Sequence, residues 1–138
     1  MAKTVQEVMT PSPRTVETST TVADAARLLR DEDVGSLPVI ESGKVVGVVT
    51  DRDIVLRVVA DGRDPQSTSV ADIASRAPVT VDPQQDLDEA LRLMGEHQVR
   101  RLPVVEEDGR LVGVLAQADV ATEASPQQTA EVLEEISK

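Results

Sequence analysis

The chain has 138 residues, with 14 basic against 25 acidic side chains, so its formal charge is −11 at pH 7. An acidic surface repels nucleic acids and anionic lipids, which argues against both as partners, and no apolar run reaches the ~18 residues of a membrane span. The absence of cysteine and of aromatic residues excludes disulfides, thiolate metal sites and ring stacking on a base. We therefore expect a soluble, cytoplasmic protein with an aliphatic core.

The sequence is an internal repeat of about sixty residues, followed by a tail. VQEVMTPSPRTV at 5–16 matches VADIASRAPVTV at 70–81, and SLPVIESGKVVGVV at 36–49 matches RLPVVEEDGRLVGVL at 101–115. The second copy gains one residue in a surface turn, where insertions cost little. We predict repeats at 3–60 and 70–122, a polar linker at 61–69 and a C-terminal helix at 125–137. That helix covers either its own module or a second subunit, and the sequence leaves both open.

Each copy predicts the order β-α-β-β-α, which is a mixed α/β (α+β) fold. An extended piece at 14–16 or 79–81 precedes a helix, whose capping-box pattern is Thr21-x-x-Asp24 or Asp86-x-x-Glu89. The apolar residues of the two helices recur at helical spacing: Val22, Ala25, Ala26, Leu28 and Leu29, then Leu87, Ala90, Leu91, Leu93 and Met94. Two β-branched runs joined by a glycine-containing turn, 37–40 and 45–49 in the first copy, predict a hairpin. A second helix begins after Thr50 or Ala116.

These pieces resemble a known family, the tandem CBS-domain pair or Bateman module, over about residues 3–122. The resemblance is carried by VMTPSPRTV, VGSLPVIESGKVVGVVTDRDI and VRRLPVVEEDGRLVGVLAQAD. It implies two repeats packed about a pseudo-two-fold axis, association into a homodimer, and clefts between repeats that bind AMP, ADP, ATP or S-adenosylmethionine. It also implies a non-catalytic regulatory module of the small stand-alone type, which signals to an effector protein.

The family's ribose-contacting pattern is a strand, then Thr or Ser, two residues and Asp. Thr50 and Asp53 match it in the first copy, whereas the second copy has Ala116 in place of the threonine and retains only Asp119. We therefore predict unequal clefts, with the better nucleotide site at Thr50 and Asp53. The same spacing is also a capping box, and one aspartate can cap the helix before a ligand arrives and pair with ribose afterwards.

Further candidates for the nucleotide site come from the resemblance and from side-chain chemistry. Arg100 and Arg101 carry planar guanidinium groups that grip phosphate, or they pair with surface glutamates. Adenine would lie against aliphatic residues, which are equally candidates for plain core positions: Val16, Leu37 and Pro38 in the first copy, Val81, Leu102 and Pro103 in the second. Gly35 either permits a close backbone approach or ends the preceding helix.

The sequence also supports a second function, a dimerising scaffold whose clefts hold no ligand, because Ala116 has lost the hydroxyl group. An enzyme is disfavoured, since the sequence shows no nucleophile–base pair, metal cluster or phosphate-binding glycine loop. His97 is the single histidine and is predicted to lie at a helix end.

Overall fold

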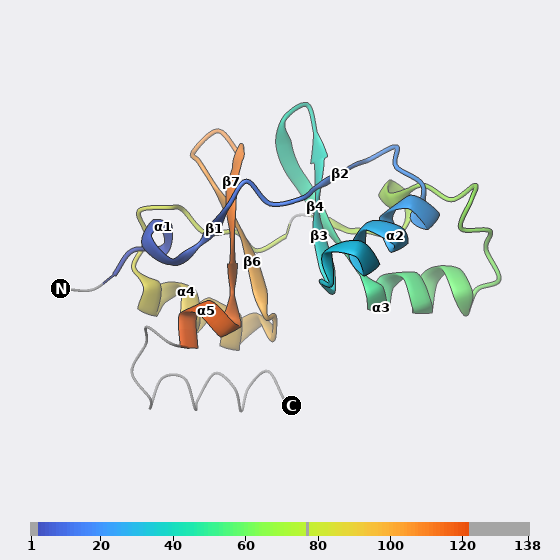
Figure 1. Cartoon of the computed structure of the whole chain (residues 1–138). Coiled ribbons are helices and arrows are strands. Elements are labelled where there is room, and N and C mark those ends of the chain that lie inside the picture. The colour runs from blue at the N-terminus through green and yellow to red at the C-terminus, as the bar shows by residue number, and fades with distance from the viewer. Residues whose placement is uncertain (1–2, 77, 122–138) are drawn as a thin grey trace. The chain divides into compact units, whose positions relative to one another are not determined.

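The computed structural model describes residues 3–76 and 78–121 (Figure 1). The chain divides into two compact units, and each is described by itself. The continuous unit comprises Arg14–Pro78, and the split unit combines Met1–Pro13 with Val79–Lys138. The predicted C-terminal helix at 125–137 lies outside the described residues.

The continuous unit contains a four-stranded sheet in the order β2-β3-β4-β5, in which β2 is parallel to β3 and the other neighbours are antiparallel. Its helical elements include a π-helical turn, η1, in which the Ala60 N–H donates to the Val55 carbonyl at 2.9 Å. The elements in chain order are β2 (Val16–Glu17), α2 (Val22–Glu32), β3 (Ser36–Glu41), β4 (Lys44–Thr50), α3 (Asp51–Ile54), η1 (Val55–Val59), the 3-10 turn η2 (Val70–Asp72) and β5 (Ser75–Arg76).

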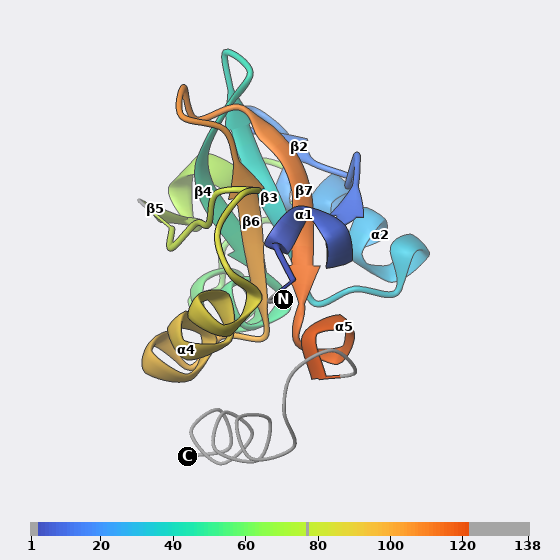
Figure 2. The ribbon, with the colours of Figure 1, turned by 90° about the vertical axis from the view of Figure 1, so that its left-hand side faces the viewer.

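The split unit has the same layout with one strand reduced to a single bridge. Figure 2 shows its strands β6 and β7 with helices α1, α4 and α5. Its sheet order is β1-β7-β6, and Val81 forms an isolated parallel bridge with Val104 of β6. This bridge therefore stands where β2 lies beside β3 in the continuous unit. The elements are α1 (Val5–Val8), β1 (Thr10–Pro11), α4 (Leu87–His97), β6 (Arg101–Val105), β7 (Leu111–Ala116) and α5 (Gln117–Ala121). His97 is the last residue of α4, as predicted.

The outer strand of each sheet comes from the sequence that begins the other copy. Strand β5, from the start of the second copy, pairs with β4 of the first, and β1, from the start of the first copy, pairs with β7 of the second. Residues 61–69, expected as a linker, lie within the continuous unit: the Val22 N–H donates to the Thr68 carbonyl at 2.8 Å, and Thr68 is buried. The compact units and the sequence copies thus divide the chain at different places.

Each unit has its own aliphatic core, consistent with a chain that contains no aromatic side chain. Helices α2 and α4 contribute their apolar faces to these cores, as their spacing predicts. The buried residues are Val16, Val22, Ala25, Leu29, Leu37, Val39, Val49, Val58, Val70 and Ile73 in the continuous unit, and Val5, Val81, Leu87, Ala90, Leu91, Met94, Leu102, Val104, Leu115 and Val120 in the split unit.

Both predicted hairpins are confirmed, and the inserted residue changes the turn between their strands. The β3–β4 hairpin turns through Ser42 and Gly43, whose φ angles are 53° and 79°, as a two-residue turn with positive φ at both positions requires. The β6–β7 turn is one residue longer and uses positive φ only at Gly109 (89°) among its described residues. The insertion is therefore absorbed in the loop without altering the strands that follow it.

The caps of α2 and α4 differ from the sequence prediction. Thr21 accepts the Asp24 N–H at 3.2 Å, but the Asp24 carboxylate bonds Arg27 instead of closing the box. The capping box predicted at Asp86 is wrong, because Asp86 makes no side-chain cap hydrogen bond, and the Glu89 carboxylate bonds Arg92.

Both helices end in a left-handed residue, Asp33 after α2 and Gln98 after α4, each with φ of 54°. The left-handed conformation lets the backbone turn away and satisfies the last carbonyls of a helix. Gly35 therefore does not end α2. A close backbone approach at Gly35 stays a prediction, and its nearest neighbour is described with the candidate site.

Candidate functional site

The predicted ribose-binding pair lies where β4 passes into α3. The Asp53 N–H donates to Thr50 Oγ1 at 3.0 Å, and the Thr50 N–H donates to Asp53 Oδ2 at 3.0 Å. These two bonds form a complete capping box, and both residues are half-buried. The local pattern Thr-x-x-Asp therefore does cap the helix, as one of its two interpretations predicts.

The capping box leaves polar atoms available at the same place. Asp53 Oδ1 takes part in no hydrogen bond within the described part of the chain, and an accepting hydroxyl such as that of Thr50 still carries its own proton to donate. An ionised carboxylate can accept from two adjacent hydroxyl groups. Capping and ribose binding are thus chemically compatible here.

The start of β3 completes this region, which we call the repeat-1 corner: Gly35, Ser36, Thr50, Asp51 and Asp53. The Asp51 N–H donates to the Gly35 carbonyl at 3.0 Å, and a Cβ atom on Gly35 would lie 3.5 Å from Asp51 Oδ2. Among the described residues, neither aspartate forms an ion pair with lysine or arginine. The corner therefore presents carboxylates that no protein cation neutralises.

The matching repeat-2 corner consists of Arg100, Arg101, Ala116, Gln117 and Asp119. The Gln117 N–H donates to the Arg100 carbonyl at 2.7 Å, which reproduces the backbone bond between Asp51 and Gly35. Asp119 is half-buried in the first turn of α5. The two corners thus share one backbone geometry and differ in their side chains.

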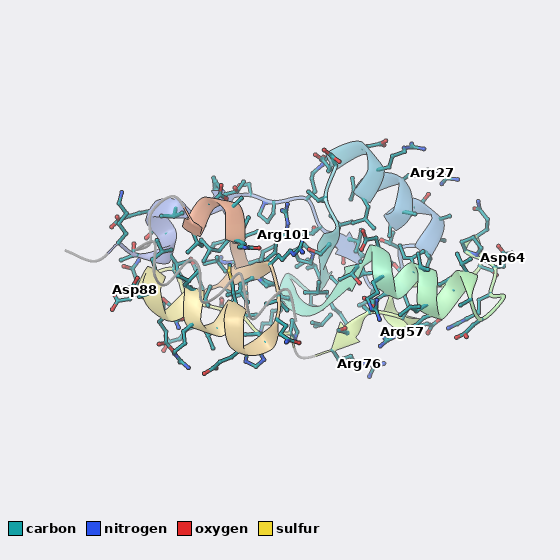
Figure 3. The ribbon with its side chains drawn as sticks, turned by 90° about the horizontal axis from the view of Figure 1, so that it is seen from below. Arg27, Arg57, Asp64, Arg76, Asp88 and Arg101 are labelled. Atoms are coloured by element: carbon teal, nitrogen blue, oxygen red, sulfur yellow. The ribbon has the colours of Figure 1, made fainter. Side chains whose placement is uncertain are left out.

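Arg100 and Arg101 are exposed, and Figure 3 shows Arg101 at the start of β6. Neither side chain forms an ion pair or hydrogen bond with another residue of the described chain. The alternative of surface pairing with nearby glutamates is therefore not found in 3–76 and 78–121. Their role toward phosphate stays a prediction.

The predicted adenine contacts are buried in the cores of their units. Leu37 is 2% exposed and Leu102 is 1% exposed, which fits the core alternative for these two residues. The other members of the set are also buried: Val16, Pro38, Val81 and Pro103. Their contact with adenine stays a prediction.

Two surface hollows lie elsewhere in the units. One, of about 320 Å³, belongs to the continuous unit and is lined by Thr18, Val39, Glu41, Val46, Gly47, Ala71, Ala74, Ser75 and Arg76. The other, of about 490 Å³ in the split unit, is lined by Asp82, Pro83, Gln84, Glu106, Glu107 and Asp108. No predicted nucleotide-binding residue lines either of them. Over the described residues, no group of three acidic or histidine side chains is placed to hold a metal ion, and no helix is long and apolar enough to cross a membrane.

Comparison with known proteins agrees with the repeat organisation. The model of the CBS domain matches residues 5–60 and again residues 70–125. The chain belongs to the CBS-domain family. CBS-domain protein YhcV of Bacillus subtilis is 40% identical to it over 126 residues, which are 91% of this chain and 89% of YhcV.

Two solved structures of CBS proteins match this CBS-domain chain in fold. The crystal structure of Hypoxic Response Protein I with two coordinated zinc ions gives a TM-score of 0.81 at 35% identity, covering 89% of this chain and all of the other. The crystal structure of CBSX2 in complex with AMP gives 0.75 at 35% identity, covering 86% and 93%. The mixed α and β architecture predicted from the sequence is thereby confirmed.

Proposed function

We propose that this CBS-domain protein is a non-catalytic regulatory module. It binds an adenosine-containing ligand, AMP, ADP, ATP or S-adenosylmethionine, and ligand binding changes its association with an effector protein. The observation that carries the proposal is the half-buried Thr50–Asp53 box, in which one carboxylate oxygen has no partner among the described residues. The AMP bound by CBSX2, which is 35% identical, supports this ligand class.

In this proposal Asp53 anchors the ribose. Its Oδ1 accepts from the two ribose hydroxyls, while Oδ2 keeps its bond to the Thr50 N–H and so holds the carboxylate in place. The Thr50 hydroxyl donates to a ribose oxygen without giving up its bond from the Asp53 N–H. The cap thus positions the anchor before any ligand arrives.

A regulatory output needs two states that bind the ligand differently, because a ligand shifts an equilibrium only by its difference in affinity for the two states. In this proposal the output is association with an effector protein. Affinity capture in the presence and absence of ligand would identify that partner.

Calorimetric titration with adenosine, AMP, ATP and S-adenosylmethionine tests the proposal, since intrinsic aromatic fluorescence is absent. Asp53→Asn keeps an oxygen that accepts the Thr50 N–H, so the helix start persists while the charged acceptor is lost. Hydrogen bonds to charged groups contribute about 1.5–3 kcal/mol, so we expect affinity to fall by about 10- to 150-fold.

The control for this experiment is Asp61→Asn, which removes one exposed carboxylate from the same unit. Thermal unfolding of both variants shows whether each is folded. If Asp53→Asn and Asp61→Asn titrate like the wild type, the ribose anchor is not Asp53.

A second function, a scaffold that dimerises without ligand, is favoured by one observation. Val55, Leu56 and Val59 are 55%, 46% and 69% exposed and all lie on η1. Exposed apolar patches of this kind mark interaction surfaces. If no adenosine-containing compound binds the wild type, this second function replaces the first.

A further inference from the structure

The first observation is a paired exchange of side chains between the two corners. Ser36 lies directly opposite Thr50 in the β3–β4 register, and Arg101 lies directly opposite Ala116 in the β6–β7 register. Directly opposed residues of an antiparallel pair lie on the same face, with Cβ atoms about 5 Å apart. The position that loses a hydroxyl group in the second repeat therefore faces the position that gains a guanidinium group.

The second observation is that the charge of the corners is opposite. Asp51 and Asp53 give the repeat-1 corner two negative charges, one of which the adjoining Arg52 offsets, whereas Arg100, Arg101 and Asp119 give the repeat-2 corner one net positive charge. Each corner keeps the aspartate proposed to hold a ribose. The difference therefore lies in the groups that would meet whatever is attached to that ribose.

The third observation is the pairing state of the arginines. In this acidic chain Arg14, Arg27, Arg30, Arg63, Arg92 and Arg110 all form ion pairs with carboxylates. Arg100 and Arg101 form none within the described residues, which is also true of Arg52, Arg76 and Arg57, although Arg57 donates to the Ile73 carbonyl. An exposed guanidinium group that has no carboxylate partner can form charge-assisted hydrogen bonds with a phosphate.

We infer that the two corners are specialised for different adenosine derivatives, an inference that rests on the function proposed above. The repeat-2 corner binds the phosphorylated derivative, with Asp119 on the ribose and Arg101 on the phosphate beside the small side chain of Ala116. The repeat-1 corner binds a derivative without phosphate, because Asp51, next to the ribose anchor, repels phosphate and attracts a cationic group such as a sulfonium. Asp51 and Arg101 are the specificity-determining residues.

This division differs from the expectation that the Thr50 side is the better nucleotide site, because it assigns nucleosides to that side and phosphorylated derivatives to the other. A hydroxyl and a carboxylate in a complete capping box suit a nucleoside. A phosphate at that corner would meet the carboxylate of Asp51. The backbone N–H of Asp51 is already bonded to the Gly35 carbonyl and cannot bind the phosphate. The repeat-2 corner lacks the hydroxyl and is equipped for the phosphate instead.

The experiment exchanges the matched residues between the corners. Asp51→Gln introduces the residue of the repeat-2 corner, and Arg101→Ser introduces that of the repeat-1 corner. Adenosine, AMP and S-adenosylmethionine are titrated calorimetrically into the wild type and both variants. The controls are Asp61→Gln and Lys44→Ser, which make the same charge changes at exposed positions outside both corners.

For Arg101→Ser we expect the AMP affinity to fall about tenfold or more while adenosine changes less than about twofold, as loss of a phosphate contact predicts. For Asp51→Gln we expect the repeat-1 corner to bind AMP about tenfold more tightly and S-adenosylmethionine more weakly, because one negative charge near the ligand is gone. The controls should leave the affinities for all three ligands within about twofold of the wild-type values, since exposed distant charges are screened.

Equal losses of AMP and adenosine in Arg101→Ser would overturn the phosphate role of Arg101. An unchanged ratio of AMP to adenosine affinity in Asp51→Gln would overturn the role of Asp51. Both results presuppose that the wild type binds adenosine or AMP. A wild type that binds none of adenosine, AMP and S-adenosylmethionine instead refutes the proposed function itself, so the two failures are distinguishable.

Discussion

At the scale of single residues, two matched glycines show why the repeat retains glycine in GVV and GVL. A Cβ atom on Gly47 would lie 2.5 Å from the Ser75 carbonyl oxygen, and one on Gly113 would lie 2.9 Å from the Thr10 carbonyl oxygen. Neither glycine has positive φ. Each is therefore required by the close approach of the exchanged strand, β5 or β1, and not by backbone conformation.

We expect Gly47→Ala to destabilise the protein by about 1–3 kcal/mol, because the methyl group displaces β5 from β4. Gly35→Ala is the matched control, since its Cβ atom would meet its nearest neighbour at an ordinary 3.5 Å. Urea unfolding followed by far-ultraviolet circular dichroism measures both changes. Equal stabilities for the two variants would show that β5 shifts to accommodate the methyl group without loss of stability.

At the scale of elements, the two long helices are equal in length but start differently. Helices α2 and α4 each have 11 residues and each end in a left-handed residue. Thr21 caps α2 through its hydroxyl group, whereas Asp86 makes no side-chain cap bond to α4. Equivalent places in a repeat therefore need not carry equal stabilising interactions.

We expect Thr21→Ala to lower the free energy of unfolding by about 1 kcal/mol, the usual contribution of a cap. Asp86→Ala should lower it by less than about 0.5 kcal/mol, as for an exposed side chain without such a bond. Thermal unfolding of the two single variants decides the comparison. A larger loss in Asp86→Ala than in Thr21→Ala would contradict it.

At the scale of the whole molecule, an apolar strip stands out on an otherwise acidic chain. The π-helical turn places Val58 in the core at 0% exposure, while Val55, Leu56 and Val59 face outward. Burying such a strip removes apolar area from water, which drives protein association. A second copy of the chain offers the same strip, so a symmetric contact would cover both.

We therefore expect a homodimer in solution that Leu56→Asp dissociates, because each interface would then bury unpaired charge. Ser42→Asp adds the same charge at the tip of the β3–β4 hairpin, well away from α3 in the continuous unit (Figure 1), and should leave the dimer intact. Size-exclusion chromatography with light scattering gives the mass of each protein. A monomeric wild type, or a dimeric Leu56→Asp, refutes this interface.

The sequence by itself determined the features that depend on neighbouring residues. The β-α-β-β-α order, the two hairpins, the apolar faces of α2 and α4 and the cap formed by Thr50 and Asp53 all follow from local periodicity, turn residues and short spacings. The family also followed from the sequence, because two copies in register carry more information than either motif alone.

Only the tertiary structure decided which distant segments lie together. It placed β5 on β4 and β1 on β7, buried Thr68 of the expected linker, and put Arg101 opposite Ala116. Strand pairing between distant segments depends on the position of residues far apart in the chain, and a local pattern contains no information about it.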